Sequence, residues 1–155
     1  MTLWRVSNYA VLDGAGGLRA PGRWHTRGKH IVYCAESAAA ALLETLVHAE
    51  IDVEDIPLAF RYLEIEAADS GTVEAIRPAD LGSAWRTRLD HTRRIGDEWL
   101  RSGRTAILRV PSVIAPETWN YLINPAHPEC AAIRIARVHK YVFDRRLLRL
   151  ARQTR

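Results

Sequence analysis

Alternating apolar and polar residues predict the strands of this chain. The clearest alternation runs over 58–67, where one face carries Arg61, Leu63, Ile65 and Ala67 and the other carries Tyr62, Glu64 and Glu66. A period of two is typical of a strand with one buried face. Further strands are expected at 3–6, 31–34, 105–110 and 133–143, with 113–115 continuing the third of these after a bend at Pro111.

Two stretches predict helices. Ser37 is a good N-cap for a helix that ends at about Ala49, and this helix is apolar almost all round, so we expect it to be largely buried. Ser83 is expected to cap a longer helix, from Ala84 to about Arg101. Its large apolar side chains are expected to point inward: Trp85, Leu89, Ile95 and Trp99.

Two segments are typical of loops. The stretch 8–29 contains five glycines and one proline, and the stretch 117–128 has three prolines in or beside it. Several strands and two main helices predict an α+β fold with a mixed sheet and flanking helices. The length of 155 residues suits one core, so we expect residues 1–155 to form a single compact domain.

Composition excludes several classes of protein. Hydrophobic residues make up 48% and charged residues 26%, as in ordinary globular domains. No apolar run approaches the ~20 residues that span a bilayer. The N-terminus lacks the pattern of a signal peptide, so we expect a cytoplasmic protein. Two cysteines, Cys34 and Cys130, and six histidines without a His-x-x-x-His pair give no reason to expect a metal site.

The net charge of +4 is unevenly distributed. From residue 134 to the end the chain has eight Arg or Lys and one acid, whereas 50–80 has nine acids and two arginines. The Arg-rich C-terminal tail, about 144–155, could serve nucleic acid, anionic lipid, an acidic partner or solubility alone. A non-enzymatic nucleic-acid-binding module stays open as the weaker alternative, because the tail lacks interleaved aromatic residues and the chain has no recognisable binding motif.

Two charged residues stand in unusual surroundings. Glu44 lies in the middle of the apolar helix, where a carboxylate needs a partner or lines a cleft. It either serves a site, pairs with an arginine or reaches water at a frayed edge. Arg23 follows Gly22 in the glycine-rich loop, and the pair offers close backbone approach and a planar fork for phosphate. Taken alone, Arg23 is more simply a surface arginine, and the chain has neither a Rossmann nor a Walker motif.

The stretch 110–128 is the third unusual segment. Ser112 follows Val110-Pro111 without a Gly-x-Ser-x-Gly setting or an adjacent base, so it does not indicate a serine hydrolase. The polar residues after it, Asn120, Asn124 and His127, could simply cap the backbone of an ordered loop.

Together these segments resemble the RES domain, a family named for an Arg, a Glu and a Ser. Its first half is matched by Gly22-Arg23-Trp24, then Gly28, Tyr33 and the run 37–44, and its second half by 110–112 followed by 120–128. The resemblance extends from about Trp4 to Phe143. The three named residues map onto Arg23, Glu44 and Ser112. His25 stands where the family more often has Asn.

The resemblance implies a fold similar to ADP-ribosyltransferases and the toxin of a type II toxin–antitoxin pair that depletes NAD⁺. The implied reaction is cleavage of the nicotinamide–ribose bond by a glycohydrolase or a phosphorylase. It implies no cofactor, with NAD⁺ as substrate and inorganic phosphate as a candidate co-substrate. A mono-ADP-ribosyltransferase that modifies a protein stays open, since the acceptor is not fixed. The implied partner is an Xre-like helix-turn-helix antitoxin, so nucleic acid would be met only through that partner.

The chemistry of such a reaction suggests a role for each group. Glu44 would stabilise the positive charge that develops on the ribose, and Arg23 would hold the pyrophosphate. Tyr33 would stack on nicotinamide, and Ser112 would hydrogen-bond the substrate near the scissile bond without acting as a nucleophile. Alongside Tyr33, the expected substrate-binding set contains Gly22, Trp24, Asn120, Asn124 and His127.

Overall fold

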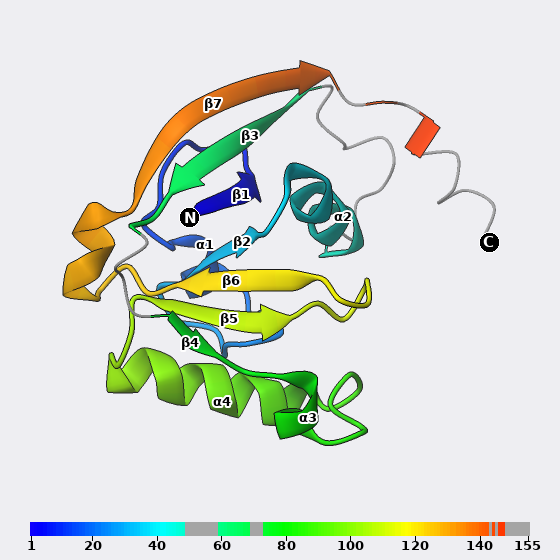
Figure 1. The fold of residues 1–155 in the computed structure, drawn as a ribbon, viewed down its shortest axis with the longest axis vertical. Helices are drawn as coiled ribbons and strands as arrows, with labels where there is room; N and C mark the ends of the chain where they lie inside the picture. The colour runs from blue at the N-terminus through cyan, green and yellow to red at the C-terminus, as the bar shows by residue number, and fades with distance from the viewer. Residues whose placement is uncertain (49–58, 69–72, 143, 145, 148–155) are drawn as a thin grey trace.

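The computed structural model describes residues 1–48, 59–68, 73–142, 144 and 146–147. Seven strands form one sheet in the order β4-β5-β6-β2-β1-β3-β7 (Figure 1). The strands are β1 (Thr2–Val6), β2 (Val32–Ala35), β3 (Ala59–Glu66), β4 (Val73–Ala75), β5 (Ile107–Pro111), β6 (Trp119–Ile123) and β7 (Arg134–Val142). Neighbouring strands are antiparallel, except that β4 and β5 are parallel.

Four α-helices and one 3₁₀ helix accompany the sheet in the described residues. They are α1 (Gly16–Arg19), α2 (Ala38–His48), α3 (Pro78–Leu81), α4 (Leu89–Ser102) and the 3₁₀ helix η1 (Pro128–Ala132). Figure 1 shows α4 lying along the β4–β5 side and α2 beside the middle of the sheet. The expected α+β class, with a mixed sheet and flanking helices, is confirmed.

The sheet consists of two halves that meet along a short contact. All five residues of β1 pair with β3, and all four residues of β2 pair with β6. Between β1 and β2 the pairing gives only one register pair, Trp4 with Ala35. Because so little ladder joins them, the half β7-β3-β1 and the half β2-β6-β5-β4 spread apart in Figure 1.

The two larger of three apolar clusters in the described residues fill most of the interior. The first joins the two halves of the sheet through Leu3, Val32, Leu63, Ile65, Ile107 and Ile123. The burial of Leu63, Ile65 and Ala67 confirms the alternation expected for β3, although Arg61 on the same face is exposed. The second cluster lies under α4 and is built on three tryptophans, Trp24, Trp85 and Trp99. Of the residues expected to point inward, Trp85 and Trp99 are buried, Ile95 is partly buried, and Leu89 is exposed.

The helix α2 begins as expected but is less buried than expected. The Ser37 hydroxyl accepts a hydrogen bond of 3.1 Å from the Ala40 amide, which confirms the N-cap. The expectation of a largely buried helix is wrong. Of the residues of α2 whose burial is described, only Ala41 is buried, and Leu43 and Val47 are exposed. The reason is that α2 packs on β1 and β2 by one side only, which carries Ala40, Ala41, Leu42 and Leu46.

The predicted start of the long helix is also wrong. Helix α4 begins at Leu89, not after Ser83, and 83–87 form turns. Gly82, with a φ of 77°, ends α3 and turns the chain. The turns that follow carry Trp85 into the core, where its ring lies 6.3 Å from that of Trp24. Helix α4 therefore begins at Leu89, after the turns that place the Trp85 side chain in the core.

The predicted loops contain regular structure. Strand β6 lies in the stretch expected to be a loop, because Asn120 and its neighbours gain backbone partners on both sides from β2 and β5. The short helix α1 lies in the glycine-rich stretch, and β4 and α3 were not expected. Residues 113–115 do not continue β5, since the Ser112 hydroxyl accepts hydrogen bonds from the amides of Ile114 and Ala115 and the chain turns there.

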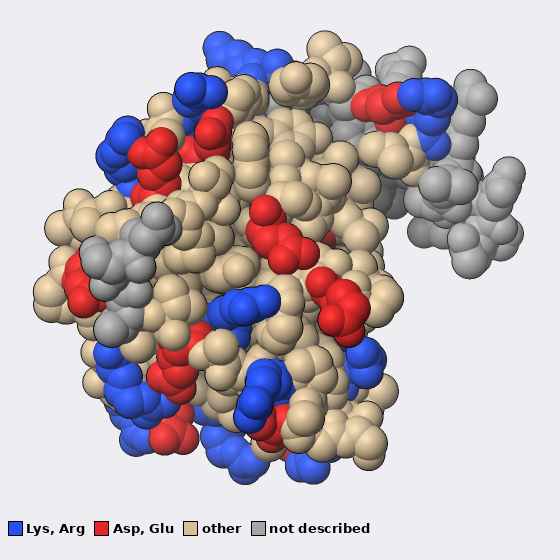
Figure 2. Space-filling model, in the orientation of Figure 1, with Lys and Arg blue, Asp and Glu red and all other residues tan. Residues whose placement is uncertain are grey.

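The pairing of β3 with β7 accounts for part of the uneven charge. It brings Arg134 to Glu66 and Arg137 to Glu64 as ion pairs across the two strands, and His139 Nε2 lies 2.9 Å from Glu64 Oε2. Basic and acidic side chains are interspersed on the face of the molecule seen in Figure 2. Most of the Arg-rich tail, together with the expected helix end at Ala49 and strand end at Phe143, lies outside the described residues.

Candidate functional site

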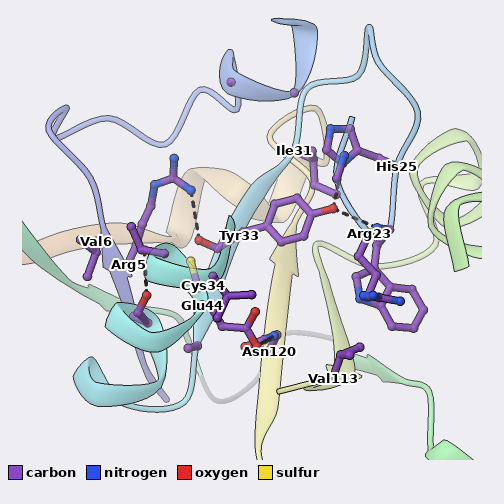
Figure 3. Close-up of a pocket in the computed structure, with 18 of the residues that line it drawn as sticks. Arg5, Val6, Arg23, His25, Ile31, Tyr33, Cys34, Glu44, Val113 and Asn120 are labelled. Atoms are coloured by element: carbon purple, nitrogen blue, oxygen red, sulfur yellow. Dashed lines mark hydrogen bonds between the residues drawn. The ribbon is translucent and has the colours of Figure 1, made fainter. Parts of the chain in front are cut away.

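A cleft of about 500 Å³ lies where the two halves of the sheet meet. Its walls come from β1, β2, α2, the start of β6 and the glycine-rich segment 16–25 (Figure 3). Six of the residues proposed from the sequence line it: Gly22, Arg23, Trp24, Tyr33, Glu44 and Asn120. Its volume lies in the range of small-ligand sites, roughly 300–1,000 Å³.

The Glu44 carboxylate is held by two side chains from distant parts of the chain. The Ser112 hydroxyl and the Asn120 Nδ2 each donate a hydrogen bond of 2.7 Å to Glu44 Oε1. Hydrogen bonds to an ionised acceptor are short and strong, so they fix the orientation of the carboxylate. The partners of Glu44 are therefore an alcohol and an amide in addition to its electrostatic interaction with Arg23.

Ser112 lies behind Glu44, outside the lining of the cleft. It is buried, and its oxygen already accepts from the amides of Ile114 at 3.1 Å and Ala115 at 3.3 Å. Both backbone donors occupy the lone pairs of the oxygen, so the hydroxyl proton is directed at Glu44. The structure thus gives Ser112 a contact with the carboxylate, where the sequence had suggested a contact with substrate.

Arg23 places a cation in the same cleft as Glu44. Its Nη1 donates a hydrogen bond of 3.0 Å to the Arg86 carbonyl. Partial burial lowers the pKa of Arg23, and the negative charge of Glu44 raises it. An arginine stays protonated under all ordinary conditions, so this end of the cleft is positively charged.

Helix α4 holds the backbone on both sides of the Arg23 side chain. The buried Thr92 hydroxyl donates to the Arg23 carbonyl at 2.7 Å, and Arg93 Nε donates to the Gly22 carbonyl at 2.9 Å. These two adjacent residues of one rigid helix satisfy two consecutive carbonyls of the loop. The position of Arg23 is therefore set by α4 rather than by the loop alone.

The next turn of α4 extends this attachment. Gly96 packs so closely on the loop that an added Cβ would lie 1.8 Å from the Trp24 carbonyl oxygen. Asp97 accepts hydrogen bonds of 3.0 and 2.7 Å from the amide and hydroxyl of Thr26. A residue larger than glycine at 96 would force the loop or the helix to shift.

Tyr33 and His25 join the loop to β2. Tyr33 Oη accepts from the Trp24 amide at 3.1 Å and lies 2.8 Å from His25 Nδ1, and His25 Nε2 lies 3.1 Å from the Ala20 carbonyl. Burial lowers the pKa of His25 and raises that of Tyr33, so both side chains are neutral at pH 7. The neutral imidazole then donates from Nε2 and accepts from Tyr33 at Nδ1. Figure 3 shows the Tyr33 ring reaching toward Arg23 and His25.

Comparison with known proteins gives the family. The family model for the RES domain matches residues 2–144. The chain belongs to the RES domain family. The extent of the match agrees with the resemblance found in the sequence, and the three residues of that resemblance, Arg23, Glu44 and Ser112, all lie at or beside the cleft.

Two relatives illustrate the family. The RES domain described here is 45% identical over 147 residues to "Toxin Res" of Pseudomonas putida strain KT2440, covering 95% of this chain and 99% of the relative. It is 39% identical over 160 residues to "Prs ADP-ribosylating toxin" of Sphingobium sp. strain YBL2, covering 97% and 98%. Both relatives therefore match along nearly their whole length.

A solved structure shares the fold. The M. tuberculosis MbcT–MbcA toxin–antitoxin complex contains a chain that superposes with a TM-score of 0.72 at 18% identity. The match covers 99% of this RES domain and 89% of that chain. At this identity the likeness concerns the fold alone.

Two residues expected at the site lie away from the cleft. Asn124 is buried, donates to the Leu100 carbonyl at 3.4 Å and accepts from the Ala126 amide at 3.1 Å. His127 caps η1, since its Nδ1 accepts from the Glu129 amide at 3.2 Å. In this RES domain both side chains organise the backbone after β6, as the simpler interpretation of the segment proposed.

Arg5 lines the cleft but was not proposed from the sequence. It lies on β1 and donates a hydrogen bond of 3.1 Å from Nη1 to the Tyr33 carbonyl. This contact bridges the two halves of the sheet close to their single register pair. In the sequence, the indication would have been that Arg5 is the one charged residue in the short apolar strand expected at 3–6.

The described residues give no support for a metal centre or a membrane span. No group of three or more His, Cys, Asp or Glu among them is arranged to hold a metal ion. Among the same residues, no helix has the length and apolar character needed to cross a bilayer.

Proposed function

We propose that this RES domain cleaves the nicotinamide–ribose bond of NAD⁺ and acts as the toxin of a toxin–antitoxin pair. The observation that carries the proposal is the fixed Glu44 carboxylate, held by Ser112 and Asn120 in a cleft that also contains Arg23. NAD⁺ offers a matching pair of features, a ribose that becomes positive during cleavage and an anionic pyrophosphate.

The carboxylate supplies electrostatic stabilisation. When the C–N bond breaks, nicotinamide leaves with the bonding electron pair as a neutral molecule, and the ribose acquires oxocarbenium character. A preorganised negative group beside the ribose lowers the energy of this state more than that of bound NAD⁺. Glu44 is suited to this task because its hydrogen bonds are already formed in the free protein. Attack by water then gives ADP-ribose and a proton, and attack by inorganic phosphate gives phosphorylated ADP-ribose.

The positive end of the cleft suits the pyrophosphate. The planar guanidinium of Arg23 can form paired, charge-assisted hydrogen bonds to phosphate oxygens. Glycine at 22 is required by the packing that positions Arg23, because an added Cβ there would lie 2.6 Å from Tyr33 Oη. The Tyr33 ring would stack on the nicotinamide. No cofactor takes part in this scheme, and NAD⁺ itself is the substrate.

Transfer of ADP-ribose to a protein is the second candidate. It is favoured by the 39% identity to a relative named for ADP-ribosylation of Prs. The same activated ribose serves both reactions, because they differ only in which nucleophile attacks it. The residues around Glu44 are compatible with either acceptor.

Control by a partner follows from the toxin role. The structural relative with the shared fold was solved as a toxin–antitoxin complex. We propose that an antitoxin, of the Xre-like helix-turn-helix type, occludes the cleft so that NAD⁺ cannot enter. Expressing the chain alone in bacteria should then arrest growth. Co-expressing the neighbouring reading frame should restore growth, and its protein product should co-purify with this chain. Normal growth on confirmed expression of soluble, active protein would refute the toxin role.

Product analysis tests the reaction. Purified protein is incubated with NAD⁺, with and without inorganic phosphate and with a candidate protein acceptor, and the products are resolved. Nicotinamide with ADP-ribose identifies hydrolysis, nicotinamide with phosphorylated ADP-ribose identifies phosphorolysis, and a labelled protein band identifies transfer. Recovery of intact NAD⁺ under all three conditions would contradict the proposal.

A further inference from the structure

In the side-chain amide of Asn120, the nitrogen has a hydrogen-bond partner, whereas the oxygen is buried without one in the described residues. Its Nδ2 donates to Glu44 Oε1 at 2.7 Å, whereas Oδ1 accepts no hydrogen bond within the described part of the chain although it is buried. The orientation of the amide is fixed by chemistry, since an ionised carboxylate can only accept and must face the NH₂ group. The orphan atom is therefore an acceptor, and Asn120 lines the cleft.

An unpaired buried acceptor lowers the stability of the folded protein, and the fold itself gives no reason for an acceptor at this position. A buried polar atom without a partner destabilises the folded state, and most buried polar atoms in native proteins have a partner. Asn120 lies on β6, whose backbone is already paired with β2 and β5 on either side, so the strand does not depend on this side chain. Holding Glu44 would need only a donor, because Ser112 does the same with a hydroxyl alone.

We propose that Asn120 Oδ1 accepts a hydrogen bond from a hydroxyl of the ribose that Glu44 stabilises, and that it thereby selects a ribose-containing substrate. The inference rests on the proposed NAD⁺ cleavage. The position of the amide beside the carboxylate carries it: the donor that satisfies Oδ1 must lie next to Glu44, where the reacting ribose is placed. A ribose presents two adjacent hydroxyl donors, and a carboxylate with a neighbouring amide oxygen presents two adjacent acceptors.

The test compares two variants that differ in one respect. Asn120→Ala and Ser112→Ala each remove one of the two hydrogen bonds to Glu44 Oε1, but only Asn120→Ala removes the acceptor from the cleft. Nicotinamide release is measured as kcat/KM for NAD⁺ and for analogues lacking the 2′ or the 3′ hydroxyl of the nicotinamide ribose. A site built to bond a hydroxyl discriminates strongly against an analogue without it. We expect the parent and Ser112→Ala to share the same preference for NAD⁺ over one of the analogues, and Asn120→Ala to reduce that preference at least ~10-fold.

The results separate three cases. Equal preferences in Asn120→Ala and Ser112→Ala, for both analogues, would show that Asn120 acts only by positioning Glu44 and would overturn the inference. Loss of preference in Asn120→Ala only against an analogue whose carboxamide NH₂ is replaced by methyl would assign the donor to nicotinamide and would also overturn it. No nicotinamide release by the parent protein would instead refute the proposed function. If Asn120→Ala does not fold, as judged by thermal unfolding, Asn120→Val provides the same comparison, because valine also lacks an acceptor and is favoured in strands.

Discussion

The Ser112 hydroxyl donates a hydrogen bond of 2.7 Å to Glu44 Oε1, although 68 residues separate the two in the chain. Because Ser112 lies behind the carboxylate and outside the cleft lining, we propose that it acts through Glu44. We expect Ser112→Ala to lower kcat by about 10–100-fold, since hydrogen bonds to charged groups contribute about 1.5–3 kcal/mol, and to leave KM for NAD⁺ nearly unchanged. Steady-state kinetics of nicotinamide release measure both. A raised KM with an unchanged kcat would place Ser112 against the substrate instead.

Arg23 is expected to govern binding of the dinucleotide. Arg23→Ala should raise the KM for NAD⁺ more than it lowers kcat, because the pyrophosphate is bound in both the ground state and the transition state. Arg23→Lys should recover only part of the loss, since a point charge cannot reproduce the paired bonds of the guanidinium. Calorimetric titration with ADP-ribose gives the same comparison without turnover. A Lys variant that matches the parent in both assays would rule out the phosphate-clamp role.

The contact of Gly96 with the Arg23 loop predicts an effect at a distance. In Gly96→Ala the new Cβ would lie 1.8 Å from the Trp24 carbonyl oxygen, so the loop or the helix must shift. Overpacking of this kind typically costs about 1–3 kcal/mol. We expect a lower free energy of unfolding, together with a raised KM for NAD⁺ in the protein that remains folded.

Glu98→Ala provides the control for Gly96→Ala, since Glu98 is exposed on the same helix. Chemical denaturation and steady-state kinetics of both variants check the prediction. If the two variants had the same stability and KM, α4 would not set the position of Arg23.

The buried His25 predicts a dependence of stability on pH. Burial lowers its pKa below the usual value of 6.5 in the folded protein, so the unfolded chain binds the proton more readily. The contribution of neutral His25 is therefore fully present above about pH 6.5 and is lost as the pH falls. The added slope is at most about 1.4 kcal/mol per pH unit for one proton. His25→Asn, the residue more common in the family resemblance, should show a shallower loss of stability between pH 6.5 and 5 in urea denaturation. Identical slopes in the two proteins would exclude His25 as the source.

The sequence predicted most of the strands and the residues around the cleft, for identifiable reasons. The alternation in β3 follows directly from one buried face, and Ser37 caps α2 through its own side chain. These are local properties, so a pattern in the chain reveals them. The resemblance to the RES domain grouped Arg23, Glu44 and Ser112 as residues of one site without any knowledge of the distances between them.

The features that the sequence missed depend on tertiary contacts. Strand β6 contains the polar Asn120, and its extended backbone is fixed by β2 and β5 on either side. The partners of Glu44 come from residues 68 and 76 positions away, which periodicity cannot reveal. The exposure of Leu43 and Val47 contradicts the apolar pattern of α2, because that helix packs by only one side on the described sheet. Asn124 and His127 share their segment with Asn120, yet the turn after β6 directs them to the backbone.

Nicotinamide release from NAD⁺ by the parent protein and by Glu44→Gln tests the central claim most directly. The amide preserves the size of the side chain and removes its charge, so the comparison isolates electrostatics from packing. We predict that the parent releases nicotinamide. Glu44→Gln, with an unchanged melting temperature, should release it about 10²–10³-fold more slowly. A folded Glu44→Gln protein with near-parental release would contradict the assignment of Glu44 as the charge-stabilising group.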